Sequence, residues 1–106
     1  MIDADTINAA YALTAKATHA LAEATVLETR IRVEIEFRKA YLLTSGEIDG
    51  KNAEARDAQL RDRMSTEHET LADVQATVAE SRTNLTLAQL EVDRCKTLLR
   101  LLETRL

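Results

Sequence analysis

The sequence predicts an all-α fold: an antiparallel two-helix coiled-coil hairpin that forms a single domain over residues 1–106 and dimerises into a four-helix bundle. Three observations predict this fold class. The 106 residues include no proline and only two glycines, Gly46 and Gly50, so residues that interrupt helices are confined to one short stretch. Apolar residues follow the 4-3 spacing of a coiled coil through the second half of the chain. Aromatic residues make up only 3%, which is typical of the thin cores of paired helices.

The first helix is expected over about residues 4–44. Residues 31–37 (IRVEIEF) alternate with period two, as a strand would, but helical sequence continues on both sides and no second strand is available for pairing. Alanines in the first half of the helix would let another helix approach closely. The apolar face of this helix consists of Ile7, Ala10, Leu13, Ala17, Ala20, Leu21, Ala24, Leu27, Ile31, Ile35 and Leu42.

The turn is expected over residues 45–52, where both glycines lie. Gly46 can close the first helix in the left-handed conformation, and Asn52 is a good N-cap for the next helix. Glu54 would then lie in the first turn of that helix, where the helix dipole favours a negative charge. The second helix is therefore expected over about residues 53–105.

The second helix carries the clearest repeat in the sequence. Its seam has 4-3 spacing and is apolar except at Glu67 and Ser81, which indicates coiled-coil packing. Thr66 and Glu69 have the spacing of a capping box, so the sequence leaves open whether the helix is continuous through residues 65–69. The seam positions are Leu60, Met64, Glu67, Leu71, Val74, Val78, Ser81, Leu85, Ala88, Val92, Cys95, Leu99, Leu102 and Leu106.

Each helix also carries a second apolar stripe. A two-helix hairpin has one internal seam, so the second stripes are left without a partner inside a single chain. This surplus predicts self-association, most simply a homodimer that forms a four-helix bundle over part of its length. The second stripes are Val26, Val33, Phe37 and Ala40 on the first helix, and Leu87, Leu90, Leu98 and Leu101 on the second.

The last twelve residues, CKTLLRLLETRL, contain five leucines. Folding the chain at the glycine turn places Leu27 opposite Leu71 and Leu13 opposite Leu85, so residues 95–106 would project beyond the first helix by about 18 Å. Exposed apolar patches usually mark interfaces. The sequence leaves three possibilities open for residues 95–106: these segments of two subunits pack together, the segment docks in another protein, or it folds back on its own chain. The expected interface is Val92, Cys95, Leu98, Leu99, Leu101, Leu102 and Leu106.

Composition argues against several classes of function. The formal charge of −4 disfavours a dedicated binder of phosphate backbones. Cys95 is the only cysteine, so no internal disulfide can form, and a small buried residue in a cytosolic protein is expected. The N-terminal residues MIDADTINAAYALTAK do not have the pattern of a signal peptide, and no apolar run approaches a membrane span. We therefore expect no membrane partner.

No pattern of catalytic, metal-binding or cofactor-binding residues is found, so we expect neither an enzyme nor a cofactor. His68-Glu69 lacks the second histidine of a zinc-protease motif, and the chain has neither a Cys-x-x-Cys pair nor a glycine-rich phosphate loop. The run Glu67-His68-Glu69 is interpreted as a solvated helix face, with Glu67 a tolerated polar position in the seam.

Basic residues near the turn suggest an alternative function. Arg38, Lys39, Lys51 and Arg56 would contact nucleic acid if the chain were an accessory factor in recombination or replication. Between residues 28 and 63, however, eight acidic residues accompany eight basic ones, so the local net charge is zero. This balance favours a surface of ion pairs over a nucleic-acid contact, which stays the alternative.

Residues 41–56, YLLTSGEIDGKNAEAR, resemble a segment of small phage and prophage proteins in which G-K-N-A-E-x-R opens a second long helix. Here that motif runs from Gly50 to Arg56. Such proteins are often encoded near recombination or single-strand-binding genes. The resemblance implies a phage accessory protein that acts on a host or phage protein in the bacterial cytoplasm. Small secreted hairpins of the Trp-x-Gly type share the length, but this chain has no tryptophan.

Overall fold

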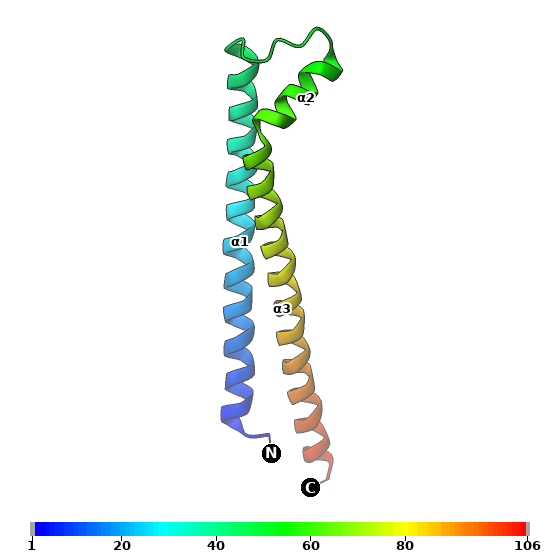
Figure 1. Ribbon diagram of the computed structural model, residues 1–106. Helices are drawn as coiled ribbons and strands as arrows, with labels where there is room; N and C mark the ends of the chain where they lie inside the picture. Colours follow the sequence, from blue (N-terminus) through cyan, green and yellow to red (C-terminus); the bar gives the residue numbers. More distant parts are fainter. Residues whose placement is uncertain (1, 106) are drawn as a thin grey trace. The chain divides into compact units, whose positions relative to one another are not determined.

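The computed structural model describes residues 2–105 and contains three α-helices: α1 (Ala4–Thr44), α2 (Ala53–Arg63) and α3 (Ser65–Thr104) (Figure 1). No strand occurs in this range, so the predicted all-α class is confirmed. Residue contacts group the chain into two compact units: unit 1 combines Met1–Ala24 with Thr77–Leu106, and unit 2 is Thr25–Ala76. The single domain over residues 1–106 and the dimer stay predictions.

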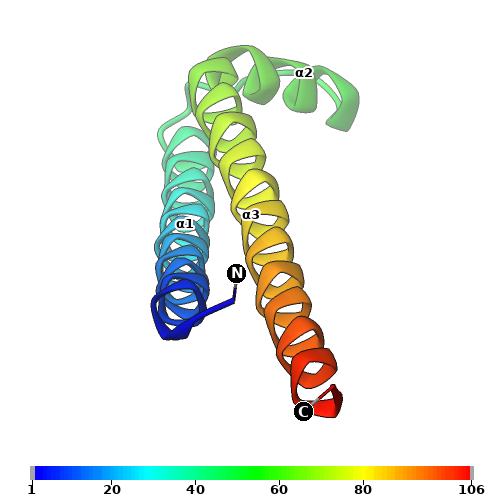
Figure 2. The same ribbon diagram turned by 90° about the horizontal axis from the view of Figure 1, so that it is seen from below.

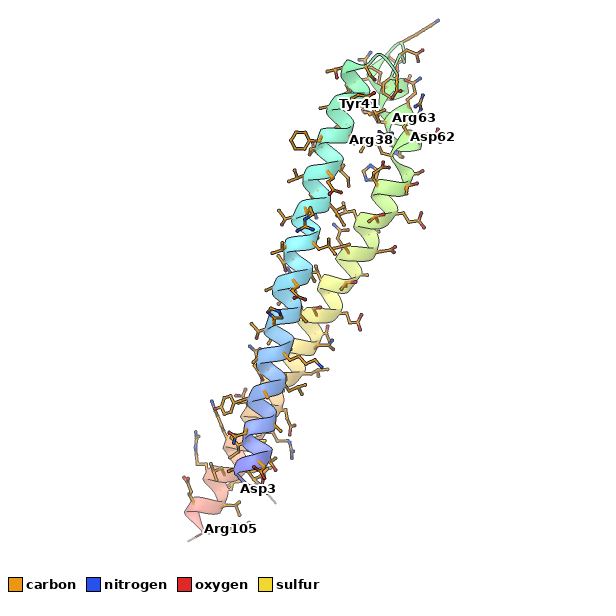
Figure 3. All side chains as sticks on the ribbon, turned by 90° about the vertical axis from the view of Figure 1, so that its left-hand side faces the viewer. Asp3, Arg38, Tyr41, Asp62, Arg63 and Arg105 are labelled. Atoms are coloured by element: carbon orange, nitrogen blue, oxygen red, sulfur yellow. The ribbon has the colours of Figure 1, made fainter. Side chains whose placement is uncertain are left out.

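The helix α1 has the predicted bounds, and each end has an identifiable cause. Asp3 lies at its start (Figure 3). Its Oδ1 accepts hydrogen bonds from the backbone N–H and the hydroxyl of Thr6, both at 2.8 Å. These bonds stabilise the ionised carboxylate and lower the pKa of Asp3. The stabilisation by this cap is therefore fully present above the usual pKa of an aspartate and is lost as the pH falls through the lowered pKa of Asp3. At the other end, Gly46 has the left-handed φ of 81°.

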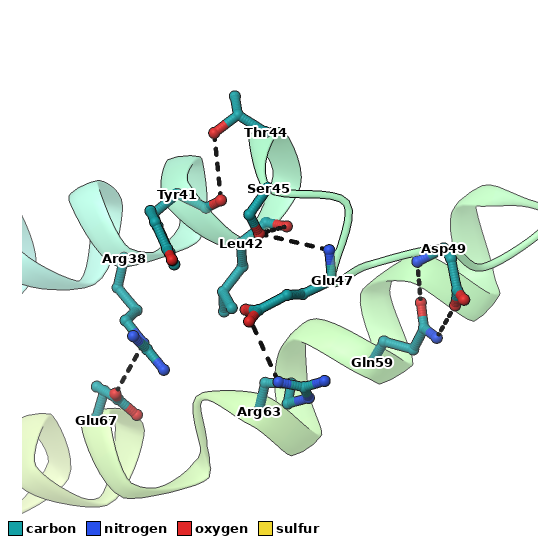
Figure 4. Close-up of polar contacts among 10 residues, drawn as sticks. All are labelled: Arg38, Tyr41, Leu42, Thr44, Ser45, Glu47, Asp49, Gln59, Arg63 and Glu67. Carbon is teal, nitrogen blue, oxygen red and sulfur yellow. Dashed lines mark hydrogen bonds and ion pairs between the residues drawn. The ribbon is translucent and has the colours of Figure 1, made fainter.

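Unit 2 is a helical hairpin whose connection, residues 45–52, is tied to α2. The Gln59 side-chain oxygen accepts hydrogen bonds from the N–H groups of Asp49 and Gly50 at 3.1 and 2.8 Å, and its amide nitrogen donates to Asp49 Oδ1 at 2.7 Å (Figure 4). Asn52 caps α2 as predicted, because its Oδ1 accepts from the N–H of Ala55 at 2.8 Å. The connection is therefore held in one conformation.

The predicted second helix is divided at Met64. This residue has φ −108° and ψ 18°, outside the helical range, and α2 turns away from the axis of α3 there (Figures 1 and 2). Met64 is only 1% exposed, so the bend lies inside the core. Because α3 begins at Ser65, Thr66 is not its N-cap, and the proposed capping box is not its start.

The core of unit 2 draws on all three helices and on the connection. The bend at Met64 lets α2 approach the connection while α3 stays beside α1, so that one apolar cluster contains residues from every element. The buried members are Ile31, Ile35, Leu42, Ile48, Leu60, Met64 and Val74, with Leu71 half-buried against them.

The predicted α3 seam is confirmed over most of its length. Every seam position from Leu60 to Cys95 is buried or half-buried, whereas Leu99 and Leu102 are exposed and Leu106 lies outside the described residues. The polar position Glu67 has a partner, because its carboxylate lies 3.5 Å from Arg38 Nε. In unit 1 the same seam forms a thin core in which Ala10, Val92 and Cys95 are buried, with Ile2 and Ile7 packed against them.

The register between the helices differs from the predicted one by about seven residues, which is one heptad. In unit 2, Glu67 rather than residue 60 lies opposite Arg38. In unit 1, the core brings Ala10 together with Cys95, where the predicted register places residue 88. The cause in unit 2 is the connection: Ile48 is buried, and Gln59 of α2 bonds to the connection rather than to α1.

Two predicted pairs are therefore wrong. Leu13 and Leu27 are exposed instead of facing Leu85 and Leu71. The half-buried seam positions of α1 are instead Thr14 and Glu28, each of which directly follows one of these leucines. The seam of α1 keeps its seven-residue repeat by including polar side chains, which were not among its predicted apolar positions.

We predict that Leu42→Ala lowers the free energy of unfolding by about 2–5 kcal/mol, because a fully buried leucine is removed from the unit 2 core. The matched control is Leu43→Ala, which truncates an exposed leucine at the next position and should change stability by less than ~1 kcal/mol. Urea denaturation followed by circular dichroism measures both. Equal losses for the two variants would contradict the described core.

Gly50→Ala should destabilise the chain by about 1–3 kcal/mol. An added Cβ would lie 2.7 Å from the backbone nitrogen of Arg56 and 2.8 Å from the carbonyl carbon of Ala55, and backbone atoms cannot move aside cheaply. As a control, Gly46→Asn adds a side chain into open space at a left-handed position that asparagine tolerates. Thermal unfolding compares the two, and an unchanged midpoint for Gly50→Ala would refute the close approach.

Candidate interaction surfaces

The described residues offer little that resembles a chemical site. Within residues 2–105, no group of three or more His, Cys, Asp or Glu side chains is placed to hold a metal ion. No helix in that range is both long enough and apolar enough to cross a membrane. The notable feature is apolar: large hydrophobic side chains lie exposed on both units. These exposed apolar surfaces are the candidate sites of the chain.

The first surface is the leucine end of α3, which we define as Leu98, Leu99, Leu101 and Leu102. Leu98 is half-buried, and the other three are exposed, Leu101 at 53%. A groove of about 440 Å³ follows this end, where the start of the chain lies beside α3 in unit 1. Its lining consists of Ile2, Thr6, Arg94, Leu98, Leu101, Leu102 and Arg105.

Two arginines line the groove at the leucine end, and one of them is ion-paired. Arg94 donates from Nε and Nη2 to the Glu91 carboxylate at 3.0 and 2.8 Å, a two-bond arrangement that fixes the guanidinium at the groove. These bonds lower the pKa of Glu91 and raise that of Arg94, so both stay charged across the physiological range. Arg105 adds a second cation to the lining. The groove lining therefore combines apolar side chains with one arginine that is ion-paired to Glu91 and with Arg105.

The predicted interface is only partly available to a partner. Of the described residues 96–105 only Leu98 is half-buried and the others are exposed, but Val92 and Cys95 are buried in the core of unit 1 together with Ala10 and are not accessible to a partner. The reason is the register, which extends α1 further along α3 than predicted. Of the remaining residues, the leucine end stays accessible, and Leu106 lies outside the described residues.

The second surface is the outer face of α1 in unit 2, defined by Val26, Val33, Phe37 and Ala40. Phe37 is 73% exposed, the largest value among the exposed hydrophobic residues, and Val26 and Val33 are also exposed. At ~100° per residue these side chains point away from the buried Ile31 and Ile35 of the same helix. The two stripes predicted for residues 26–40 are thus separate faces, one inward and one outward.

A third surface was not predicted. In unit 1 a groove of about 420 Å³ runs between α1 and α3, where small residues face one another and leave space between the helices. The many alanines in the first half of α1 could have indicated this groove, because small side chains also leave space between two helices. In the sequence they were interpreted only as permitting close packing. The lining consists of Leu13, Lys16, Ala17, Ala20, Ser81, Asn84, Leu87 and Ala88.

The four basic residues of the alternative function all belong to unit 2, and two of them are engaged. Arg38 contacts Glu67 at 3.5 Å, and Arg56 donates from Nη1 to the carbonyl oxygen of Gly50 at 3.2 Å. Lys39 lies beside a small cavity whose lining also contains acidic residues, and Lys51 is exposed. The arrangement disperses the positive charge instead of concentrating it.

Comparison with known proteins gives no further guidance: no family model matches the chain, and neither the curated proteins nor the solved structures yield a match. The function is therefore inferred from the surfaces of the chain itself.

We predict that the Cys95 thiol reacts with a soluble disulfide reagent on the order of 10–100-fold more slowly than an exposed thiol, because reaction requires local opening of unit 1. The control moves the thiol two residues along the helix, in a Cys95→Ala, Thr97→Cys variant, since Thr97 is exposed. The rate of absorbance change after mixing measures the difference. Equal rates would show that Ala10 does not cover Cys95.

Proposed function

We propose that this protein is a non-enzymatic protein–protein interaction module that self-associates and presents the leucine end of α3 to a protein partner. The observation that carries the proposal is the exposure of Leu99, Leu101 and Leu102 beside an apolar groove. Exposed apolar patches of this kind are costly in a monomer and usually mark an interface.

The chemistry of the leucine end supports a helical partner. Leu98, Leu101 and Leu102 are spaced three and four residues apart, so they form one ridge that can pack into the apolar face of another helix. Arg105 adds one positive charge to the lining of the same groove, whereas the charge of Arg94 is already balanced by Glu91. The proposed partner is therefore an amphipathic helix.

The identity of the biological setting is supported by resemblance alone. Residues 41–56 resemble a segment of small phage and prophage proteins, which supports a phage accessory or host-modulating role in the bacterial cytoplasm. For nucleic-acid binding, no specific observation favours the alternative: Arg38 and Arg56 already have partners, and the overall charge is −4.

Replacing Leu99, Leu101 and Leu102 by glutamine should weaken partner binding by at least ~100-fold, because three apolar side chains leave the interface while helix propensity is retained. The partner would be captured from a bacterial host lysate on the full chain, identified by mass spectrometry, and titrated in purified form by calorimetry.

The matched control replaces three exposed leucines elsewhere, Leu13, Leu27 and Leu43, by glutamine. Circular dichroism checks that both triple variants stay helical. The proposed role of the leucine end is refuted if the partner binds both variants with the affinity of the unmodified chain, or if nothing is captured above the level of the leucine-end variant.

A further inference from the structure

The outer face of α1 has features that identify what covers it. We infer that a second copy of this chain covers it, with the two α1 helices antiparallel and related by a two-fold axis at Val33. This inference rests on the self-association in the proposed function and names its surface and orientation. The first support is exposure: Phe37 is 73% exposed, and Val26 and Val33 are exposed beside it, while the core of unit 2 lies on the other side of α1.

The second support is the order of charges along the two borders of this face. At ~100° per residue, Arg30 and Glu34 border the face on one side, and Arg32 and Glu36 border it on the other. Each border therefore reads arginine, then glutamate four residues later. Residues at equal sequence distances before and after Val33 also carry opposite charges: Arg30 and Glu36 lie three residues from it, and Arg32 and Glu34 lie one residue from it.

This order selects one orientation. In an antiparallel pair of identical helices, the Arg30–Glu34 border lies beside the Arg30–Glu34 border of the second copy, which runs in the opposite direction. In a parallel pair, it lies beside the Arg32–Glu36 border of the second copy. With the axis at Val33, Arg30 lies within about 3 Å along the helix of Glu34 of the second copy, and Arg32 lies equally close to Glu36 of the second copy. The two-fold axis repeats both pairs. Glu34 and Arg32 each also lie within about 3 Å along the helix of their own copies, so the antiparallel pair has four neighbours of opposite charge and two of like charge, whereas a parallel pair would have two of opposite charge and four of like charge.

The charges are free to make these contacts. Arg30, Glu34 and Glu36 have no ion-pair partner among residues 2–105. Arg32 contacts Glu28 of its own helix at 3.4 Å, but its side chain is largely exposed and can turn toward a second copy. Their side chains therefore do not have to break a buried contact within the chain.

The apolar residues fit the same axis. Phe37 comes opposite Thr29 of the second copy, and Val26 comes opposite Ala40, so a larger side chain meets a smaller one at each level. Thr29, Val33, Phe37 and Ala40 already line one shallow groove on α1. Val33 meets its own copy on the axis. Packing and charge thus agree on one arrangement.

The test measures mass by sedimentation equilibrium on the full chain. Arg30→Glu with Arg32→Glu makes every border residue negative, and the dimer dissociation constant should rise at least ~100-fold. Adding Glu34→Arg and Glu36→Arg to that variant restores opposite charges across an antiparallel pair, so the dimer should return. Phe37→Ser should also weaken the dimer, whereas Leu13→Ser, an exposed leucine of unit 1, should not.

Orientation is tested by disulfide formation in a Cys95→Ala background. Chains with Val26→Cys and differently tagged chains with Ala40→Cys are mixed in equal amounts and oxidised mildly. An antiparallel pair should join residue 26 to residue 40 of the other copy and yield mainly the mixed dimer. A parallel pair would join identical positions and yield only the two unmixed dimers, which would overturn the inference.

The outcomes also separate this inference from the proposed function. A dimer whose mass is unaffected by the charge changes would refute the outer face of α1 as the contact while leaving self-association intact. An unmodified chain that stays monomeric at high concentration would refute self-association itself and this inference with it, but would leave partner binding at the leucine end to its own test. Circular dichroism confirms that each variant is still helical.

Discussion

The arrangement of unit 2 depends on how residues 45–52 are anchored. Ile48 enters the core, and the side chain of Gln59 bonds to both Asp49 and Gly50, so the connection packs on α2 as part of the fold. Because the connection occupies the beginning of α2, Arg38 of α1 lies opposite Glu67 of α3 instead of opposite α2. The anchoring therefore decides which residues of α1 and α3 share the core and which are left on the surface.

The local sequence pattern is sufficient to predict the helices and the faces that they bury. The absence of proline, the two glycines and the 4-3 repeat predict the bounds of α1, the cap at Asn52 and the buried seam from Leu60 to Cys95, because each depends on residues close in sequence. The same holds for residues 31–37, whose two stripes follow from the helical period once the strand is rejected.

The register could not be predicted in the same way, because it depends on contacts between residues far apart in sequence. A tight glycine turn is the simplest interpretation of residues 45–52, and nothing local shows that Ile48 is buried or that Met64 bends the helix. An error of about seven residues, one heptad, leaves the buried faces of the helices nearly unchanged, but it changes every facing pair. This is why the seam was predicted correctly while Cys95 was assigned to an interface.

The seam of α1 explains why apolar residues remain on the outside. Polar Thr14 and Glu28 occupy half-buried positions, while Phe37 and Val26 lie exposed on the opposite face, so burial of its own core does not account for the apolar residues of this helix. A helix that kept only its inner contacts would gain nothing from an aromatic side chain pointing into water. A second contact gives these residues a role, and the ordered charges beside them are the kind of feature that excludes alternative pairings. In the proposed dimer, core formation and association would use different faces of one helix, and a substitution on the outer face would alter assembly without altering the fold.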